Sequence, residues 1–292
     1  MMGKASRGMS FLYCGLVYLL ALAAGYMTFR FFEDGGILLA TFLADVAATV
    51  VVWFCGLLWR NASLYDPYWS VAPLIILPLW LWTSSGTIGT AGILFIIAVY
   101  AWGLRLTYNW ANRWEGLAHQ DWRYTMLKEK NPGMWFVTNL MGINLMPTVL
   151  VFLGMVPVYY AARAGGSAGV LTYAGFAVCM GAALLQAVAD RQMEAFKKSG
   201  ADQDDHICTG LWSLSRHPNY LGEVSFWWGI WLIQMGVTPV WFTTIGPVAI
   251  TLLFVFVSIP MMERHVEENR PGYATYKKHV PMLVPFTKMS GR

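Results

Sequence analysis

Charge is scarce in this sequence. Charged side chains make up 12% of the 292 residues, whereas soluble domains carry roughly 25%. No polar stretch is long enough to build a core of its own, which excludes a separate soluble domain. Hydrophobic residues make up 57% of the chain and occur in long blocks. The composition therefore predicts an all-α, polytopic membrane protein, organised as a single integral membrane domain over residues 1–292.

Familiar metal and cofactor motifs are also lacking. The 4 cysteines have neither the spacing of metal ligands nor the pattern of a disulfide framework, so we expect no metal site. There is no Rossmann glycine fingerprint, P-loop, HExxH motif or nucleophile elbow. The net charge is only +4 and the basic residues are scattered, which gives no reason to expect nucleic acid as a partner. A cofactor would have to be held by helix ends and charged side chains.

Long apolar runs are what the sequence has instead. Each is close to the roughly 20 residues that cross a bilayer as a helix. They cover residues 10–29, 37–59, 68–84, 90–110, 135–162, 170–190, 219–236 and 240–262. The runs are continuous rather than alternating, which favours helices over barrel strands. The first run continues past the length of a signal peptide, so we expect it to be a membrane helix.

The basic residues predict an orientation for these spans. With eight spans, 18 of the 20 Lys and Arg residues fall on the side of both termini, and only Arg30 and Arg163 fall on the other. The positive-inside rule then places both termini in the cytoplasm, in a bacterial inner membrane or its equivalent. A seven-span arrangement would break this sorting unless one run is re-entrant. We therefore expect seven or eight transmembrane helices and a cofactor pocket open to the cytoplasmic side.

The densest polar cluster lies at residues 210–223, directly before an apolar run. Pro218 suits the first turn of a helix, so the N–H groups of that turn would point toward Arg216 and His217. Such a helix end is a ready site for a phosphate. The alternative is that Arg216 only contacts lipid headgroups, but this leaves Glu223 unexplained, because a carboxylate inside the membrane needs a partner.

A second cluster precedes the run that begins at residue 68. Asp66 stands just before Pro67, so one interpretation makes it the N-cap of the next helix. The functional alternative is a buried carboxyl with a raised pKa, able to donate a proton or a hydrogen bond. On residues 102–116, Arg105 and Asn109 share a helix face, and Arg105 could simply reach the headgroups. Tyr108 beside them is a candidate to share a substrate carbonyl with Asp66.

Two further segments carry polar residues in helical register. Residues 186–198 form a stripe that is either a solvated face with ion pairs or part of a cofactor site; its members are Gln186, Asp190, Glu194 and Lys197. Lys197 and Lys198 could supply charge for a 2′-phosphate. The tail, residues 261–286, reads either as a plain tail or as a cofactor-covering segment, and its polar members are Glu263, Glu267, Arg270, Tyr273, Tyr276 and Lys277.

The motif RHPNYLGE, residues 216–223, resembles the signature of a membrane superfamily. That superfamily joins steroid 5-alpha-reductases, sterol reductases and isoprenylcysteine methyltransferases, and Asn219 with Glu223 is closer to the reductase branch. The acid at the end of the last span, Gly-Tyr-x-x-Tyr and the terminal Pro-Phe are similar to its closing pattern. The resemblance is strong over the last third of the chain, weak over residues 60–200, and absent over 1–59, so a reductase-like core would cover 60–292.

The resemblance implies roles for particular residues. Tyr65 and Asp66 stand where 5-alpha-reductases carry a Gln-Glu pair that contacts the steroid ketone, at the same distance from a proline. Tyr65, Asp66 and Tyr108 would then be catalytic. The expected NADPH ligands are Arg105, Arg123, Gln186, Asp190, Lys197, Arg216, His217, Asn219, Tyr220, Glu223, Glu263, Tyr273, Tyr276 and Lys277. The tail residues among them would cover the adenosine end.

Three hypotheses follow. The first is an NADPH-dependent reductase of a carbon–carbon double bond conjugated to a ketone, with a 3-oxo-Δ4 steroid as the substrate that the resemblance implies. The second is a methyltransferase of the isoprenylcysteine or phospholipid type that uses S-adenosylmethionine. The third is a non-enzymatic sterol- or lipid-binding membrane protein. For the first we expect a monomer in the bilayer that takes a lipophilic small molecule.

Overall fold

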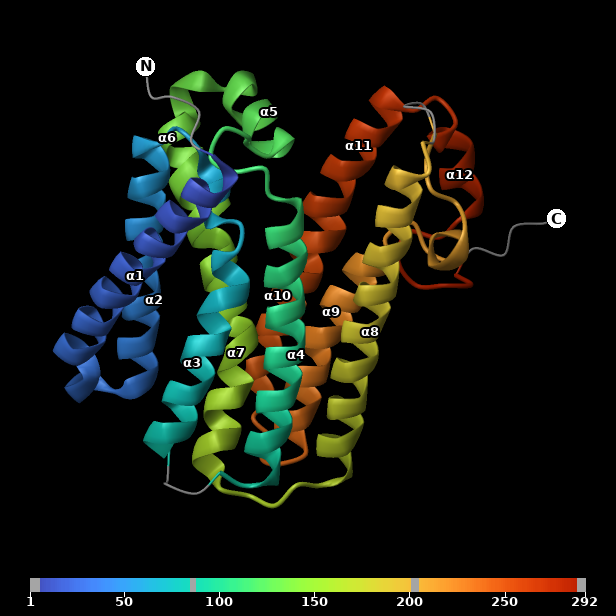
Figure 1. Ribbon diagram of the computed structural model, residues 1–292. Helices are drawn as coiled ribbons and strands as arrows, with labels where there is room; N and C mark the ends of the chain where they lie inside the picture. Colours follow the sequence, from blue (N-terminus) through green and yellow to red (C-terminus); the bar gives the residue numbers. More distant parts are fainter. Residues whose placement is uncertain (1–5, 85–87, 201–204, 288–292) are drawn as a thin grey trace. The chain divides into compact units, whose positions relative to one another are not determined.

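A computed structural model describes residues 6–84, 88–200 and 205–287, and every regular element in these ranges is a helix (Figure 1). The chain divides into two compact units, Met1–Gly165 and Gly166–Arg292, called unit 1 and unit 2 below. The all-α prediction is confirmed for the described residues.

Unit 1 is built from antiparallel membrane-length helices. Its elements are α1 (Arg7–Phe32), η1 (Glu33–Gly35), α2 (Ile37–Leu58), η2 (Ala62–Tyr65), α3 (Tyr68–Ser84), α4 (Thr90–Arg113), α5 (Trp122–Lys130), η3 (Pro132–Met134), α6 (Trp135–Val137), the π-helix η4 (Thr138–Leu145) and α7 (Met146–Ala164). The helices α1 and α2 form a hairpin, and α3 packs against both α4 and α7. The core between them is aromatic, with Trp80, Phe95 and Trp102 fully buried.

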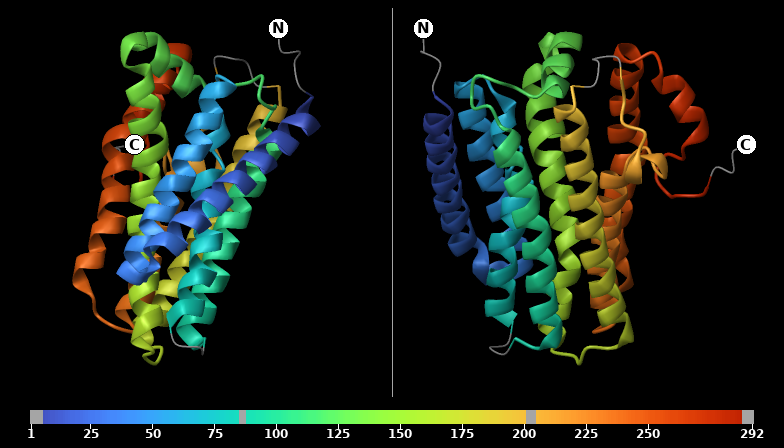
Figure 2. Two further views of the ribbon diagram at one scale, coloured as in Figure 1. Left: turned by 90° about the vertical axis from the view of Figure 1, so that its left-hand side faces the viewer. Right: turned by 45° about the vertical axis from the view of Figure 1, so that its right-hand side comes forward.

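Unit 2 is a second helical group. Its elements are α8 (Val170–Lys198), η5 (Gly210–Ser213), α9 (Pro218–Met235), η6 (Trp241–Thr244), α10 (Ile245–Leu253), the π-helix η7 (Phe254–Ser258), α11 (Ile259–Asn269) and α12 (Tyr273–His279). Figure 2 shows α12 turning away from α11 at the end of the unit. There it lies against the segment before α9, where Tyr273 and Tyr276 contact the ring of His206.

The pair α8 and α9 packs unusually closely because glycines line the contact. A Cβ added at Gly175 would lie 2.5 Å from the backbone nitrogen of Ile233, and one at Gly229 would lie 2.6 Å from the sulfur of Cys179. Such small-residue contacts are typical of helix pairs inside membranes, where lipid gives no hydrophobic drive for helix association. This approach lets polar side chains on α8 reach α9.

Six helical segments are long and apolar enough to cross a membrane. They are Arg7–Gly35, Ile37–Leu58, Thr90–Arg113, Pro132–Ala164, Val170–Lys198 and Trp241–Asn269. The protein is therefore an integral membrane protein with at least these candidate spans among its described residues. The other two apolar runs form the helices α3 and α9, which are not among these candidate spans, so the predicted count of seven or eight is not confirmed. The helix α3 has only 17 residues, and the polar side chains of Asn219, Glu223 and Gln234 make α9 less apolar.

Candidate functional site

A sharp reversal of the chain after α2 places Asp66. The backbone N–H of Asn61 donates to the carbonyl of Gly56 at 2.9 Å, and Arg60 between them has a φ of 55°. A Cβ on Gly56 would lie 3.0 Å from the Asn61 carbonyl oxygen, so the close return favours glycine there. The four residues of η2 are all buried, and η2 lies back against α2. Asp66 ends this returning turn and is partly buried.

Asp66 belongs to a cluster of four ionisable side chains in unit 1. The hydroxyl of Tyr124 donates to Oδ1 of Asp66 at 2.6 Å. Asp121, three residues before Tyr124, accepts two hydrogen bonds from the guanidinium of Arg123, at 2.8 and 2.9 Å. These three residues stand together because Asp121 caps α5 by accepting from the Arg123 backbone N–H. The turn thus presents Tyr124 to Asp66.

The pKa values of the two carboxyl groups in this cluster are shifted in opposite directions. Burial raises the pKa of Asp66 to about 7, although the Tyr124 hydrogen bond and the Arg123 charge act in the other direction. Burial acts to raise the pKa of Asp121 as well, but the hydrogen bonds and charge of Arg123 hold it below its usual value. Two carboxyl groups with separated pKa values are typical of acid–base sites. Asp66 is the one that can be protonated near neutral pH.

The N-cap interpretation of Asp66 is not what the structure shows. The helix α3 begins one residue later than that interpretation requires, with the carbonyl of Pro67 accepting from the backbone N–H of Val71 at 3.1 Å. The Asp66 carboxyl is directed to Tyr124 instead. Proline has no backbone N–H, so one fewer donor at the start of α3 needs a capping side chain as its acceptor.

A buried hydroxyl network surrounds the neighbouring tyrosines. Tyr65, 2% exposed, shares a hydrogen bond of 2.7 Å with the hydroxyl of Thr148 on α7. Thr148 in turn contacts Thr49 of α2 at 2.8 Å. Tyr68 stacks on Tyr65 with ring centres 5.3 Å apart and donates to Oδ1 of Asp45 at 2.7 Å. Asp45 thereby gains the partner that an acid within a membrane span requires.

Of the other three unit 1 residues predicted for the site, Tyr108 and Arg105 lie on α4 and Arg123 lies on α5. Tyr108 is 69% exposed and makes no hydrogen bond within the described part of the chain, so Asp66 has Tyr124 rather than Tyr108 as its phenol partner. Arg105 is half-buried on the same helix. Arg123, the third, is engaged with Asp121.

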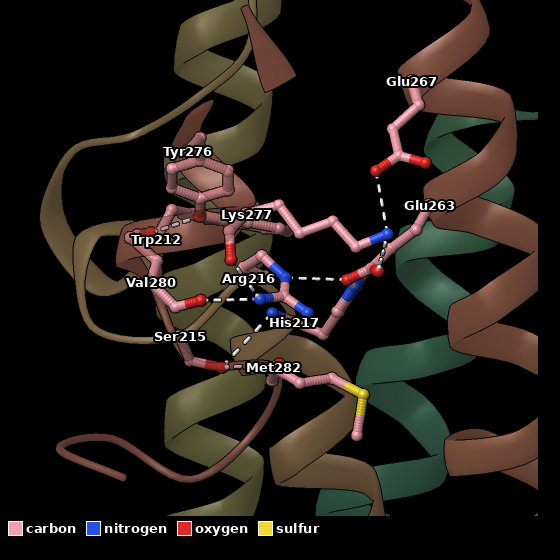
Figure 3. Close-up of polar contacts among 10 residues, drawn as sticks. All are labelled: Trp212, Ser215, Arg216, His217, Glu263, Glu267, Tyr276, Lys277, Val280 and Met282. Atoms are coloured by element: carbon pink, nitrogen blue, oxygen red, sulfur yellow. Dashed lines mark hydrogen bonds and ion pairs between the residues drawn. The ribbon is translucent and has the colours of Figure 1, made fainter. Parts of the chain in front are cut away.

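In unit 2 the cluster around Arg216 joins three segments (Figure 3). The Nε of Arg216 donates to Oε1 of Glu263 on α11 at 2.7 Å. Its Nη1 donates to the carbonyl oxygens of Lys277 and Val280 at 3.0 and 2.6 Å. These are carbonyls at the C-terminal end of α12, which lack partners within their own helix. Arg216 therefore holds the tail of the chain against α9 and α11.

Two more side chains, those of His217 and Lys277, contact Glu263. His217 Nε2 lies 3.1 Å from Oε1 of Glu263, and Nζ of Lys277 lies 3.1 Å from its Oε2 and 2.8 Å from Oε1 of Glu267. Burial lowers the pKa of His217, against the effect of Glu263. With a neutral His217, two cations are balanced by two carboxylates. The cluster thus brings together Arg216, His217, Glu263 and Lys277, all predicted from the sequence, and already satisfies their charges.

Arg216 does not extend into lipid headgroups, because its side chain is only 5% exposed. The two predicted tail tyrosines complete this region. Tyr273 and Tyr276 are 5% and 8% exposed, and the hydroxyl of Tyr276 donates to the carbonyl of Trp212. Tyr220 stacks on His217 with ring centres 5.4 Å apart.

A separate polar group connects α8 and α9. Glu223, 5% exposed, accepts from Nε2 of Gln186 and from Nε1 of Trp227, both at 2.9 Å. The expectation that Glu223 needs a partner is met by these two donors. One turn earlier, the side-chain oxygen of Asn219 is buried and has no hydrogen-bond partner within the described residues. An orphaned acceptor of this kind requires an explanation, and a ligand N–H is one.

The remaining predicted residues of α8 are less enclosed. Asp190 is partly buried and Lys197 is exposed near the end of the helix. Lys198 pairs with Glu194 at 2.5 Å, as the solvated-face alternative expects. Across the described ranges, no group of three or more His, Cys, Asp or Glu side chains is arranged to hold a metal ion.

Comparison with known families gives one match. Residues 52–280 match the family described as proteins of unknown function (DUF1295). The chain belongs to this family. The family is associated with steroid 5-alpha-reductase-like membrane proteins, and the matched region covers both clusters described above. No curated protein and no solved structure matches the chain.

The structure adds two residues to the site that the sequence did not single out. For Tyr124, the signal that could have found it is its position three residues after Asp121, the acid that caps α5. Asp45 stands inside an apolar run, and an isolated acid at that depth is itself a signal of a buried partner.

Proposed function

We propose that this chain is an NADPH-dependent reductase of the carbon–carbon double bond in a lipophilic enone, most simply a 3-oxo-Δ4 steroid. The observation that carries the proposal is the Asp66–Tyr124 pair. It combines a carboxyl whose pKa is raised to about 7 with a phenol 2.6 Å away. The family's association with steroid 5-alpha-reductase-like proteins supports the same reading.

The proposed task of the pair is to stabilise an oxygen. Reduction of an enone at the β carbon places negative charge on the carbonyl oxygen in the transition state. A protonated Asp66 donates a hydrogen bond to that oxygen, and can then pass its proton to the enolate. Groups positioned for a charge that exists mainly in the transition state accelerate the reaction rather than only binding the substrate.

NADPH supplies the hydride when it is bound. The orphaned side-chain oxygen of Asn219 fits a carboxamide N–H of the nicotinamide. Glu223 and Gln186, beside it, would orient the same half. The phosphates need cations, and both Arg216 and Lys277 are held by Glu263. Phosphate binding by these two residues therefore requires the ion pairs to exchange partners, whereas Lys197 is already exposed.

The proposal includes a location. The cytoplasm is the source of NADPH, and the positive-inside sorting of Lys and Arg favours both termini on that side of a bacterial inner membrane. We also propose a monomer, because every residue assigned a role above belongs to one chain.

The deciding experiment uses detergent-purified protein and thermal unfolding. NADPH, NADH and S-adenosylmethionine are added separately, because a ligand that binds only the folded state raises the melting temperature. Stabilisation by NADPH supports the reductase, and the wild type with Asp66→Asn is then assayed on a panel of enones. We expect Asp66→Asn to bind NADPH normally and to lose turnover. Stabilisation by S-adenosylmethionine alone would replace the proposal with methyl transfer.

A further inference from the structure

A pocket of about 270 Å³ opens in unit 1 where two candidate spans end. The residues that matter for its chemistry come from the α2–η2 turn, α5, α6 and η4, and they are Arg60, Asn61, Lys128, Trp135 and Asn139. One span ends at Leu58, just before Arg60, and another begins at Pro132, just before Trp135. The pocket therefore lies at the boundary between the apolar spans and the water-facing segments of unit 1. It does not include Asp66 or any residue of the Arg216 cluster.

The two cations of the pocket are not neutralised. Neither Arg60 nor Lys128 has an ion pair or a hydrogen bond to its side chain in the part of the chain that the structure describes, and no Asp or Glu lines the pocket. The Lys128 nitrogen lies 5.8 Å from the centre of the Trp135 ring, a cation–π distance. This contact holds the lysine by the pocket without cancelling its charge.

The third donor is deeply buried. Asn139 is 3% exposed and lines the pocket. Its side-chain oxygen accepts from Nδ2 of Asn144 at 2.9 Å, while its own Nδ2 makes no hydrogen bond among the described residues. Asn139 belongs to the π-helix η4, a rare element that is frequently found at functional sites. This nitrogen is not one of the fully buried side-chain atoms that lack a partner, so it is accessible from the pocket that Asn139 lines and can donate to a ligand there.

The backbone conformation of Arg60 also supports a binding role for this pocket. Arg60 has a φ of 55°, a left-handed conformation that is unfavourable for a non-glycine residue. Glycine would relieve this strain, but it would remove the guanidinium from the pocket. Strain retained beside unpaired donors is typical of a binding site.

We propose that this pocket binds a phosphate group, held by the Arg60 guanidinium, the Lys128 ammonium and the Asn139 amide. Phosphate offers several acceptor oxygens and negative charge, and Arg recognises it with paired donors. The group belongs either to a phospholipid headgroup or to a small soluble phosphate. Leu58 and Phe136, next in the chain to two lining residues, are 64% and 56% exposed and are available to acyl chains.

The test measures binding to the full chain in a non-ionic detergent, which offers no competing anion. Native mass spectrometry follows phosphatidylglycerol and, as the control lipid that lacks a phosphate, diacylglycerol. Calorimetry follows inorganic phosphate. Lys128→Gln removes one charge from the pocket, and its matched control is Lys130→Gln, an exposed lysine two residues later on α5 that does not line it. Thermal unfolding of each variant without ligand checks that the fold is intact.

We expect Lys128→Gln to weaken binding about tenfold, as for the loss of one charged hydrogen bond, and Lys130→Gln to have no effect. Asn139→Asp, which places a negative charge beside the ligand, should weaken it further. Preference for phosphatidylglycerol over inorganic phosphate identifies a lipid, and the reverse identifies a soluble phosphate. Equal losses in the two lysine variants, or no binding of either probe, would overturn the proposal. NADPH binding that depends on Lys128 would also overturn it, by making the pocket part of the cofactor site.

Discussion

Arg216 and Glu263 form a buried ion pair in unit 2, 2.7 Å from nitrogen to oxygen, with side chains 5% and 7% exposed. The pair joins residues 47 positions apart. Because the same guanidinium also binds two carbonyls at the end of α12, the contact determines where the tail of the chain lies. It is therefore the place to test whether the cluster is structural before any cofactor binds.

Removing the charge of Glu263 should destabilise the protein. Glu263→Gln leaves Arg216 buried with a neutral partner, and breaking a buried pair in this way costs about 3–5 kcal/mol. The matched control is Glu267→Gln, whose carboxylate is 35% exposed and also contacts Lys277; it should cost about 0–1 kcal/mol. Thermal unfolding and limited proteolysis of the tail report the difference. Equal stability of the two variants would contradict the structural role of the pair.

The rate of enone reduction should fall as pH rises through the pKa of Asp66. Burial raises that pKa to about 7, and only the protonated carboxyl donates a hydrogen bond. The active form is thus present below pH 7 and lost above it, by about tenfold per pH unit. A pH profile of kcat at saturating NADPH measures this. A rate that stays constant to pH 9 would remove Asp66 from the proton-donating role.

Tyr124→Phe should move this pH profile upward. The Tyr124 hydroxyl donates to the Asp66 carboxylate and so favours the charged form, which means that its removal raises the pKa of Asp66 further. Tyr108→Phe is the control, since Tyr108 is 69% exposed and makes no hydrogen bond in the described ranges. It should leave the profile unchanged. If Tyr108→Phe alone lost turnover, Tyr108 would be the catalytic tyrosine, as expected from the sequence.

The close approach of α8 and α9 should tolerate no methyl group at Gly229. An alanine Cβ there would lie 2.6 Å from the Cys179 sulfur and 2.9 Å from the Gly175 carbonyl oxygen, so Gly229→Ala should destabilise by about 1–3 kcal/mol. On α8, Gly181 has nothing within 4 Å of an added Cβ. Gly181→Ala should be neutral or stabilise by about 0.5–1 kcal/mol. Melting temperatures in detergent compare the two variants, and equal values would show that the helices are not in contact at Gly229.

The features that could be predicted from the sequence are those that depend on residues close together in the chain. The apolar runs predict membrane helices because each run must bury its backbone groups internally, and this result needs no knowledge of helix packing. Six of the eight runs are confirmed as candidate spans. The requirement that Glu223 have a partner also followed from the cost of a charge in an apolar run. Those expectations depend only on residues close together in the chain.

Tertiary structure decided which side chains meet. Asp66 is paired with Tyr124, 58 positions away, instead of Tyr108, because the η2 turn returns along α2 and the α5 cap presents the later tyrosine. Glu263 contacts Arg216, His217 and Lys277 together, so cations that looked available for a phosphate already have carboxylate partners. Among the described residues, Arg60 and Lys128 have none. Sequence spacing indicates which residues share a helix face. Which helix that face meets depends on the packing of the whole unit, and that packing determines the charge left for a ligand.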